Sequence, residues 1–191
     1  MGGHDDTIYV YAISDESEYS LHWTAAYGHS SAIVGLDWSR DSRFIRAVDQ
    51  AYSKLYHDVE NMMQVIDGQS VLTHPSIWQT ATCRLGWDVN GVYPPGADGT
   101  DINTVDSSSS RRLVAAGDDF GSVRLFNYPV MSNDHECIRM SGHSEHVTSV
   151  RFYEPNQVET YLISAGGYDQ TYIQWKQVGV AKGEEDDVSL E

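Results

Sequence analysis

The chain has 191 residues, of which 40% are apolar and 11% aromatic, so it can bury a sizeable hydrophobic core and is not expected to be disordered. Its formal net charge of −16, from 12 basic and 28 acidic residues, repels phosphate groups, so we expect no binding to nucleic acid or to membranes. The opening sequence MGGHDDTIYVY lacks the apolar stretch of a signal peptide, and no apolar run reaches the roughly eighteen residues of a membrane-spanning helix.

Residues 1–13 are predicted to contain the last strand of a repeat whose earlier part is missing. The sequence HDDTIYVYAI reads as a turn followed by a strand of alternating apolar residues. Asp5 precedes Tyr11 by six residues, and the same spacing separates Asp169 from Trp175. The repeated spacing indicates that both segments close a structural repeat.

Residues 14–59 are predicted to form a repeat of four strands, with the pair Gly28–His29 between the outer strand and the other three. The strands are expected at residues 19–27, 33–38, 44–48 and 52–59. Ala51 stands near the place of a turn carboxylate, and His57 stands where a tryptophan would end the last strand. We therefore expect a degraded polar network here, with strand pairing and core packing supplying the stability.

Residues 60–128 are predicted to form the most irregular repeat. Its strands are expected at residues 63–66, 82–92, 113–117 and 122–128, with TCRLGWDVNGV as the inner strand and Phe126 in place of the closing tryptophan. The sequence YPPGADGTDINTVDSSSS, residues 93–110, is interpreted as an insertion. Its Pro, Gly, Asp and Ser content predicts a surface loop without a strand.

Residues 129–177 are predicted to form a complete repeat, and residues 178–191 an acidic tail. The strands of the repeat are expected near residues 136–140 and at 146–152, 161–165 and 171–175. Each is rich in β-branched and aromatic residues and is bounded by Gly, Asp, Asn or Pro. In the tail, the acidic run at residues 184–187 predicts disorder.

Four side chains of the complete repeat have the spacing of a WD repeat: His143, which follows Gly142, then Ser164, Asp169 and Trp175. A half-buried imidazole needs a partner for each nitrogen, and a turn carboxylate and a strand serine can supply them. The indole N–H of the tryptophan can then donate to the serine oxygen. We predict that these four residues, here called the polar lock, tie the outer loop of the repeat to its last turn.

The predicted fold is all-β, a fragment of a WD-repeat β-propeller with about three four-stranded blades and one leading strand. The aromatic or histidine residues that close successive repeats fall at positions 11, 57, 126 and 175, spaced by 46, 69 and 49 residues. When the insertion is set aside, these spacings lie near the WD-repeat period of roughly 40 to 45. Because propellers use about four to eight blades, we expect the open edges to pair with the remainder of the propeller or with another copy.

The sequence also resembles a more particular family. The segments WDVNGVYPPGADGTDIN, AAGDDFGSVRLFNYP, GHSEHVTSVRF and ISAGGYDQTYIQWKQV are similar to the C-terminal propeller of the echinoderm microtubule-associated-protein-like family, over residues 28–178. The resemblance implies part of a cytoskeletal protein of the cytoplasm that contacts tubulin or microtubules, without catalytic activity or a cofactor. It assigns no tubulin contact to any residue of this chain.

Two alternative functions are considered. One is a WD-repeat adaptor subunit of another cytoplasmic or ciliary complex. The other is an enzyme built on a propeller, which would require convergent carboxylates or histidines in a cleft. The sequence contains no such constellation, so no catalytic residue is predicted.

Three groups of residues could be read as sites, and each has a structural interpretation that we favour. His143, Ser164 and Asp169 resemble a catalytic triad, but the serine would be tied to an indole. A zinc site could be sought among His135, Cys137, His143 and His146, although paired ligand spacing is absent. A calcium loop could be sought among Asp98, Asp101, Asn103 and Asp106, although the order of residues differs from an EF-hand and favours a turn network. No metal site is predicted.

Surface patches are the last alternative. Five arginines could face an acidic partner, but local pairing with acids is favoured: Arg111, Arg112, Arg124, Arg139 and Arg151. Four tryptophans could form an exposed platform, but core or interblade packing is favoured for most of them: Trp23, Trp38, Trp78 and Trp87. The two cysteines, Cys83 and Cys137, are too few for a disulfide framework and favour a reducing compartment.

Overall fold

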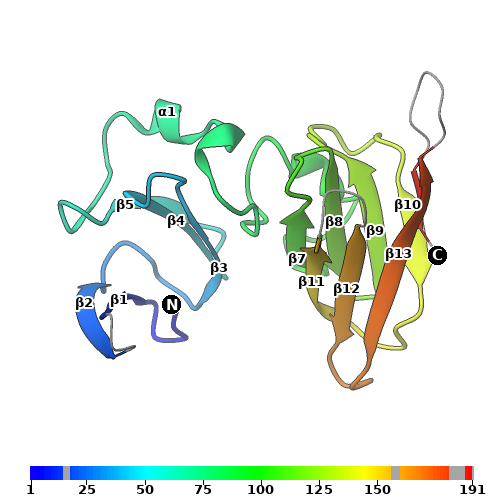
Figure 1. The fold of residues 1–191 in the computed structure, drawn as a ribbon, viewed down its shortest axis with the longest axis horizontal. Coiled ribbons are helices and arrows are strands. Elements are labelled where there is room, and N and C mark those ends of the chain that lie inside the picture. Colours follow the sequence, from blue (N-terminus) through cyan, green and yellow to red (C-terminus); the bar gives the residue numbers. More distant parts are fainter. Residues whose placement is uncertain (15–17, 156–159, 181–187, 191) are drawn as a thin grey trace. The chain divides into compact units, whose positions relative to one another are not determined.

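The computed structural model describes residues 1–14, 18–155, 160–180 and 188–190, and consists mainly of antiparallel β-strands (Figure 1). The α-helix α1, Gln69–Leu72, has four residues, and no helix in the described ranges is long and apolar enough to cross a membrane. The chain divides into two compact units, residues 1–86 and 87–191. The acidic run at residues 184–187, predicted to be disordered, lies outside the described residues.

The first unit contains a hairpin and one four-stranded sheet. The hairpin pairs β1 (Ile8–Ile13) with β2 (Tyr19–Ala25). The sheet, here called the first blade, has the strand order β3-β4-β5-β6, so that each strand pairs with the next along the chain. Its strands are β3 (Ile33–Trp38), β4 (Phe44–Asp49), β5 (Lys54–Asp58) and β6 (Met63–Gln64).

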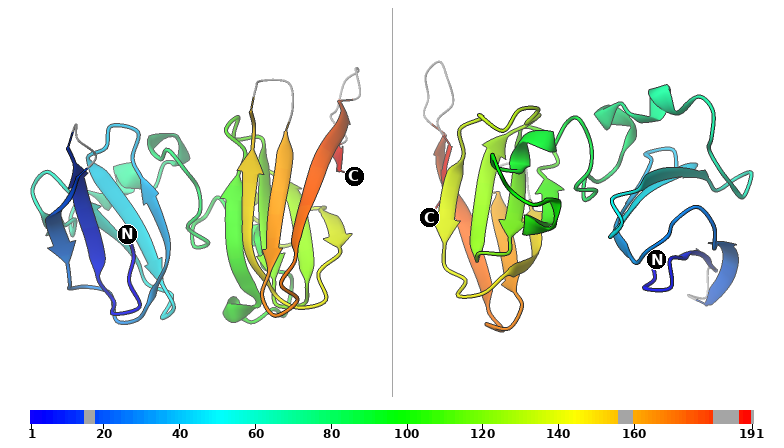
Figure 2. Two further views of the ribbon diagram at one scale, coloured as in Figure 1. Left: turned by 60° about the horizontal axis from the view of Figure 1, so that its bottom comes forward. Right: turned by 180° about the vertical axis from the view of Figure 1, so that it is seen from behind.

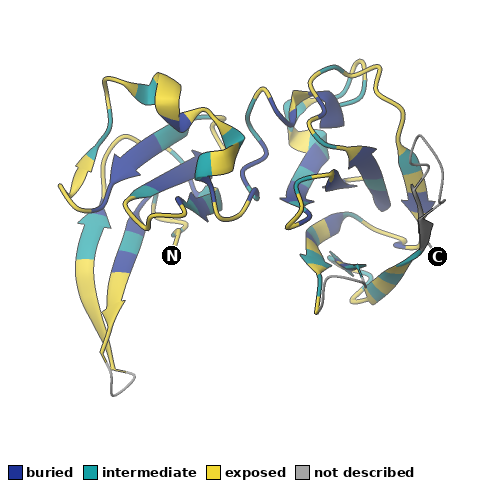
Figure 3. Cartoon of the chain, turned by 45° about the horizontal axis from the view of Figure 1, so that its top comes forward, coloured by how far each residue is buried: buried dark blue, intermediate teal, exposed yellow. Residues whose placement is uncertain are grey.

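The hairpin packs on the first blade through buried apolar residues at the ends of β1 and β2 that lie away from their connecting turn. Ile8, Val10 and Ala25 from the hairpin share a buried cluster with Ile45 and Ala47 from β4. Figure 3 shows buried residues in the strands of the first blade, whereas the last three residues of β1 and the first four of β2 are exposed.

The second unit contains two four-stranded sheets that lie side by side (Figure 2). The second blade comprises β7 (Ile102–Ser107), β8 (Leu113–Asp118), β9 (Ser122–Asn127) and β10 (Ile138–Ser141). The third blade comprises β11 (Val147–Tyr153), β12 (Tyr161–Gly166), β13 (Tyr172–Val180) and β14 (Val188–Leu190).

The core between the second and third blades is apolar and closely packed. Ala115, Val123 and Leu125 of the second blade cluster with Val150 and Leu162 of the third. All six residues of β8 are buried, which is typical of a strand enclosed on both faces. Burial of this apolar surface is the main stabilising contribution to the pair of blades.

The structure corrects the prediction for the second blade. Residues 82–92, predicted to be the inner strand, contain no strand and end in a short 3₁₀ helix at Asn90–Val92. The inner strand is β7, inside the segment 93–110 that was predicted to be a loop without a strand. The reason is that the backbone N–H groups of Thr82 and Cys83 donate to the Asp37 carboxylate, at 2.8 and 3.1 Å, and so serve a side chain rather than a strand ladder.

Candidate functional site

The polar lock lies in the third blade, where the four predicted side chains meet. Ser164 comes from β12, Trp175 from β13, Asp169 from the turn between these strands, and His143 from the segment before β11. A Cβ atom at Gly142 would approach the Ile173 side chain to 2.6 Å. The small residue of the Gly–His pair thus allows the loop to lie against β13.

The four side chains form one hydrogen-bonded chain. His143 Nδ1 lies 2.9 Å from Asp169 Oδ2, and His143 Nε2 lies 2.8 Å from Ser164 Oγ. Trp175 Nε1 donates to the same Ser164 oxygen at 3.0 Å. The Thr171 hydroxyl, which the sequence did not point to, also lies 2.9 Å from His143 Nδ1.

The charge of Asp169 determines which atoms donate and which accept in this hydrogen-bonded network. Although desolvation opposes the shift, hydrogen bonds from the Thr171 N–H and from His143 lower the pKa of Asp169, which therefore stays ionised. An ionised carboxylate accepts the Nδ1 proton, so Nε2 accepts the proton of Ser164, whose oxygen accepts from the indole. Ser164 is fully buried. Its hydroxyl thus lies away from any substrate and engages two protein partners, which is unlike the exposed nucleophile of a triad.

The first blade carries a different version of the same network. His29 Nδ1 lies 3.0 Å from Asp49 Oδ2, and Asp49 also accepts from the backbone N–H of Ser53 at 2.8 Å. Burial alone would raise the pKa of Asp49, but these hydrogen bonds lower it. The carboxylate that holds the Gly–His loop therefore comes from the end of β4 rather than from the position of Ala51.

His57 occupies the position of the closing aromatic residue and is fully buried. Its ring lies 5.6 Å from that of His29 and 6.0 Å from that of Trp23, centroid to centroid. Both His57 ring nitrogens and Nε2 of His29 are buried without a hydrogen-bond partner among the described residues. Burial, with a smaller contribution from His29, lowers the pKa of His57 to about 4, so this residue is neutral at pH 7.

The second blade has a carboxylate at the position of Asp49. Asp118, at the end of β8, accepts from the backbone N–H of Ser122 at 2.8 Å and pairs with Arg124 at 3.1 Å. In both blades the carboxylate precedes a serine by four residues, in DQAYS and DDFGS. This pattern is the sequence signal that would have identified Asp49 and Asp118 as anchors of their turns.

Inner-strand carboxylates form a second recurrent feature that sequence reasoning missed. Asp106 of β7 accepts from the Phe152 N–H of β11 at 2.8 Å, and Asp37 of β3 accepts from the Cys83 N–H. The two partners are separated by 46 residues in each case. Burial alone would raise the pKa of Asp37, but Arg46, which lies 2.9 Å away, and further donors lower it to about 2.

The residues considered as metal ligands have other partners. Asp98 and Asp101 form a reciprocal capping box at a short helix, Gly99–Asp101. Asn103 donates to Asp119 at 2.7 Å. His146 packs against the ring of Tyr168, and Cys137 is exposed. In the parts of the chain that the structure describes, no three His, Cys, Asp or Glu side chains come together as a metal site.

The arginines and tryptophans are distributed rather than gathered. Local partners engage four of the five arginines: Ser107 for Arg111, Asp118 for Arg124, Ser122 for Arg139 and the Val150 carbonyl for Arg151. Trp78 is fully buried, and its indole donates to the Leu72 carbonyl at 2.9 Å. Trp23 and Trp38 pack against the cluster between the hairpin and the first blade, whereas Trp87 is 48% exposed.

Comparison with known proteins identifies the family. The model for the second β-propeller of echinoderm microtubule-associated proteins matches residues 1–177. The chain belongs to this family. The resemblance read from the sequence is thereby confirmed, and membership makes the chain a propeller module of microtubule-associated proteins rather than an enzyme.

The echinoderm microtubule-associated protein (EMAP) relatives are similar over nearly all of this chain. Echinoderm microtubule-associated protein-like 3 of Mus musculus is 41% identical over 179 residues, which is 94% of this chain and 20% of the relative. The 77 kDa echinoderm microtubule-associated protein of Strongylocentrotus purpuratus is 39% identical over 93% of this chain and 25% of the relative. The ciliary WD repeat-containing protein ctxp80 of Euplotoides octocarinatus is 40% identical over 93% of this chain and 24% of the relative. The chain thus spans about a fifth to a quarter of these proteins.

A solved structure supports the fold. The Cps50 (Swd1) β-propeller domain of Myceliophteria thermophila matches the whole chain and 66% of its own length, with a TM-score of 0.63 and 14% identity. At that identity the likeness concerns the fold alone. Together with the family, it confirms the predicted class of an all-β WD-repeat propeller fragment.

Proposed function

We propose that this EMAP-family chain is a non-catalytic interaction scaffold that contributes part of a tubulin-binding propeller surface in the cytoskeleton of the cytoplasm. The observation that carries the proposal is the family match over residues 1–177, together with relatives named as microtubule-associated proteins. The stiff blades would hold the surface loops in fixed positions, which is how propellers present partners with a shaped surface. We further propose that the polar lock serves this rigidity.

The charge of the chain constrains how it would bind. A net charge of −16 gives no long-range attraction to an acidic surface such as that of tubulin. Binding would therefore depend on close contacts, and the association rate should rise as added salt screens the repulsion between the two acidic proteins.

Co-sedimentation with stabilised microtubules tests the proposal. The 191-residue chain should pellet with microtubules at physiological salt in a saturable manner. The Swd1 propeller, which shares the fold at 14% identity, is the matched control for non-specific trapping. Equal pelleting of both proteins, together with no capture of soluble tubulin dimer by this chain, would exclude tubulin binding.

The second candidate is an adaptor subunit of a ciliary assembly, and the similarity to a ciliary WD repeat-containing protein favours keeping it. A fluorescent fusion separates the two candidates. Labelling along cytoplasmic microtubules supports the first, whereas labelling confined to cilia, with no tubulin in the purified complex, supports the second.

A further inference from the structure

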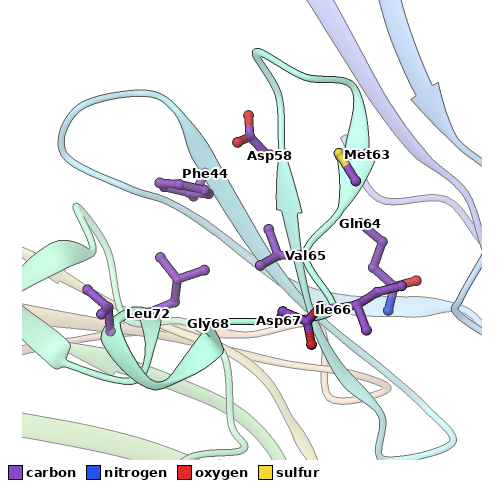
Figure 4. Close-up of a pocket in the computed structure, with 10 residues that line it drawn as sticks. Phe44, Asp58, Met63, Gln64, Val65, Ile66, Asp67, Gly68 and Leu72 are labelled. Carbon is purple, nitrogen blue, oxygen red and sulfur yellow. The ribbon is translucent and has the colours of Figure 1, made fainter.

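An apolar groove lies at the outer edge of the first blade, beside β6 and helix α1. Its volume is about 510 Å³, and Phe44, Val65 and Leu72 surround it (Figure 4). These three residues belong to the cluster built around the buried rings of Tyr56 and Trp78, so the wall of the groove is part of a packed core. A hollow with such a wall is held open by the fold rather than formed by mobile surface side chains.

Three further apolar side chains on the groove are exposed. Met63 is 51% exposed, Ile66 is 74% exposed and Val71 is 68% exposed. Single exposed apolar residues are common on protein surfaces, but three around one hollow are typical of a binding site. An occupant that covered them would gain the free energy of burying apolar surface.

The charges at the groove select the kind of occupant. Residues 58–72 include three carboxylates, those of Asp58, Glu60 and Asp67, and no lysine or arginine. Arg43 pairs with Asp58 at 3.0 Å and approaches Glu60 at 3.5 Å, so one end of the groove is partly neutralised. Asp67 lines the groove away from that end and is exposed (Figure 4). A cation placed beside Asp67 would be attracted, and an anion would be repelled.

The groove also borders a sheet edge. β6 is the last strand in the order β3-β4-β5-β6, and it supplies Met63 and Gln64 to the lining. Edge strands are places where an extended peptide can align with a sheet and put alternate side chains into adjoining pockets. We propose that this groove binds a short peptide segment of a partner protein that carries two or three apolar side chains next to a lysine or arginine.

Such a peptide is chemically unlike the acidic surface of tubulin, so groove binding and tubulin binding can fail independently. The test uses the 191-residue chain and two fluorescein-labelled peptides of twelve residues. One has two leucines and a phenylalanine flanked by lysines, and its twin has glutamate in place of every lysine. Fluorescence anisotropy at low and physiological salt measures both affinities.

The lysine peptide should bind more tightly than the glutamate twin. Val71→Asp should weaken its binding by about tenfold, because apolar contact is lost and a charge is introduced. Asp67→Lys should weaken it several-fold and reduce the preference over the twin. Ile13→Asp is the matched control, because Ile13 is an apolar residue of β1 that is 64% exposed and does not line the groove. Ile66→Asp replaces Val71→Asp if circular dichroism shows that the latter is unfolded.

Two results would overturn the proposal. Equal affinity for the two peptides would exclude selection by charge. Equal affinities of Val71→Asp and Ile13→Asp for the lysine peptide would exclude the groove as the binding site. Sedimentation velocity addresses the other occupant. A dimer that Val71→Asp dissociates and Ile13→Asp does not would assign the groove to a second copy of the chain instead.

Discussion

The first and third blades have the same strand order and the same Gly–His entrance, yet they satisfy the buried polar groups differently. In the third blade His143 has a partner for each ring nitrogen, and Ser164 passes the network on to Trp175. In the first blade His29 has Asp49 on one side, while its other nitrogen and both nitrogens of His57 are buried without a partner among the residues that the structure describes.

The comparison shows which parts of the network a blade needs. Both blades keep a carboxylate on the histidine that follows the glycine, so anchoring the loop is the shared requirement. The serine and tryptophan are replaced by Ala47 of β4 and His57 of β5, which are both fully buried, and Ala47 belongs to the apolar cluster shared with the hairpin. Packing can therefore replace the inner half of the network, although it leaves buried polar atoms that cost stability.

The largest expected effect is loss of the central hydroxyl in the third blade. Ser164→Ala should lower the free energy of unfolding by about 2 to 5 kcal/mol, because it leaves both the indole N–H and the His143 nitrogen buried without a partner. Urea denaturation measures the total loss, and hydrogen exchange in β12 locates it. Ser141→Ala, at an exposed position on β10, is the control and should be nearly neutral. A loss below about 0.5 kcal/mol would mean that the hydroxyl is not central to the blade.

Acid should weaken the first blade through His57. The pKa of His57 is about 6.5 in the unfolded chain and about 4 in the folded chain, so the folded state binds fewer protons between these pH values. The free energy of unfolding therefore has its full value above pH 6.5. As the pH falls from 6.5 to 4, protonation of His57 in the unfolded chain lowers the free energy of unfolding by about 3 kcal/mol. His57→Phe should flatten this part of the stability curve and leave stability at pH 7.5 unchanged or higher.

Urea denaturation of both proteins at pH 7.5, 6 and 5 measures this difference. His135→Gln, at an exposed histidine, is the control and should retain the wild-type pH dependence. Identical pH dependence of wild type and His57→Phe would show that the ring is accessible to protons in the folded blade.

The anchor at Asp49 is expected to matter less than the central serine. Asp49→Asn keeps one acceptor oxygen but removes the charge that faces His29, Ser30 and Ser53, and should cost about 1 to 2 kcal/mol. Thermal unfolding measures the cost, with Asp67→Asn at an exposed site as the control. A neutral result for Asp49→Asn would assign the anchoring of this loop to the backbone alone.

The smallest expected effect is a repair. Ile45 pairs with His57, and Ala47 follows Ile45 by two residues. In the third blade Leu162 pairs with Trp175, and Ser164 follows Leu162 by two residues. Ala47→Ser therefore places a hydroxyl at the position that corresponds to Ser164. It should donate to the unpaired nitrogen of His29 and stabilise the blade by about 0.5 to 1 kcal/mol. Ala116→Ser is the control, because Ala116 has the same register in the second blade, where no Gly–His pair precedes the inner strand. This substitution should destabilise the protein. A loss of stability in both variants would mean that the first blade has no room for the full network.

The third blade could be predicted from sequence because its signals are local. His143, Asp169 and Trp175 stand at fixed spacings, and the strands between them are rich in β-branched and aromatic residues. The side chains of these residues meet within one repeat, so no distant segment was needed to place them.

The second blade could not be predicted in the same way, because its determinants are distant. Residues 82–92 have the composition of a strand, but the backbone of Thr82 and Cys83 is bound by Asp37, more than forty residues earlier. Conversely, residues 93–110 were predicted to be a loop because of their Pro, Gly, Asp and Ser content, yet they contain β7, whose Asp106 carboxylate accepts from the backbone of the next blade. A single sequence does not show which backbone donor such a carboxylate will meet.

The carboxylates of Asp37 and Asp106 hold a neighbouring segment by its main chain and not by its side chains. Each of these hydrogen bonds depends on the main chain of the donor residue, and any residue except proline, which has no N–H to donate, can supply it. This connection between segments can therefore persist through side-chain substitutions at Cys83 and Phe152, even though Cys83 is buried and Phe152 packs against the core.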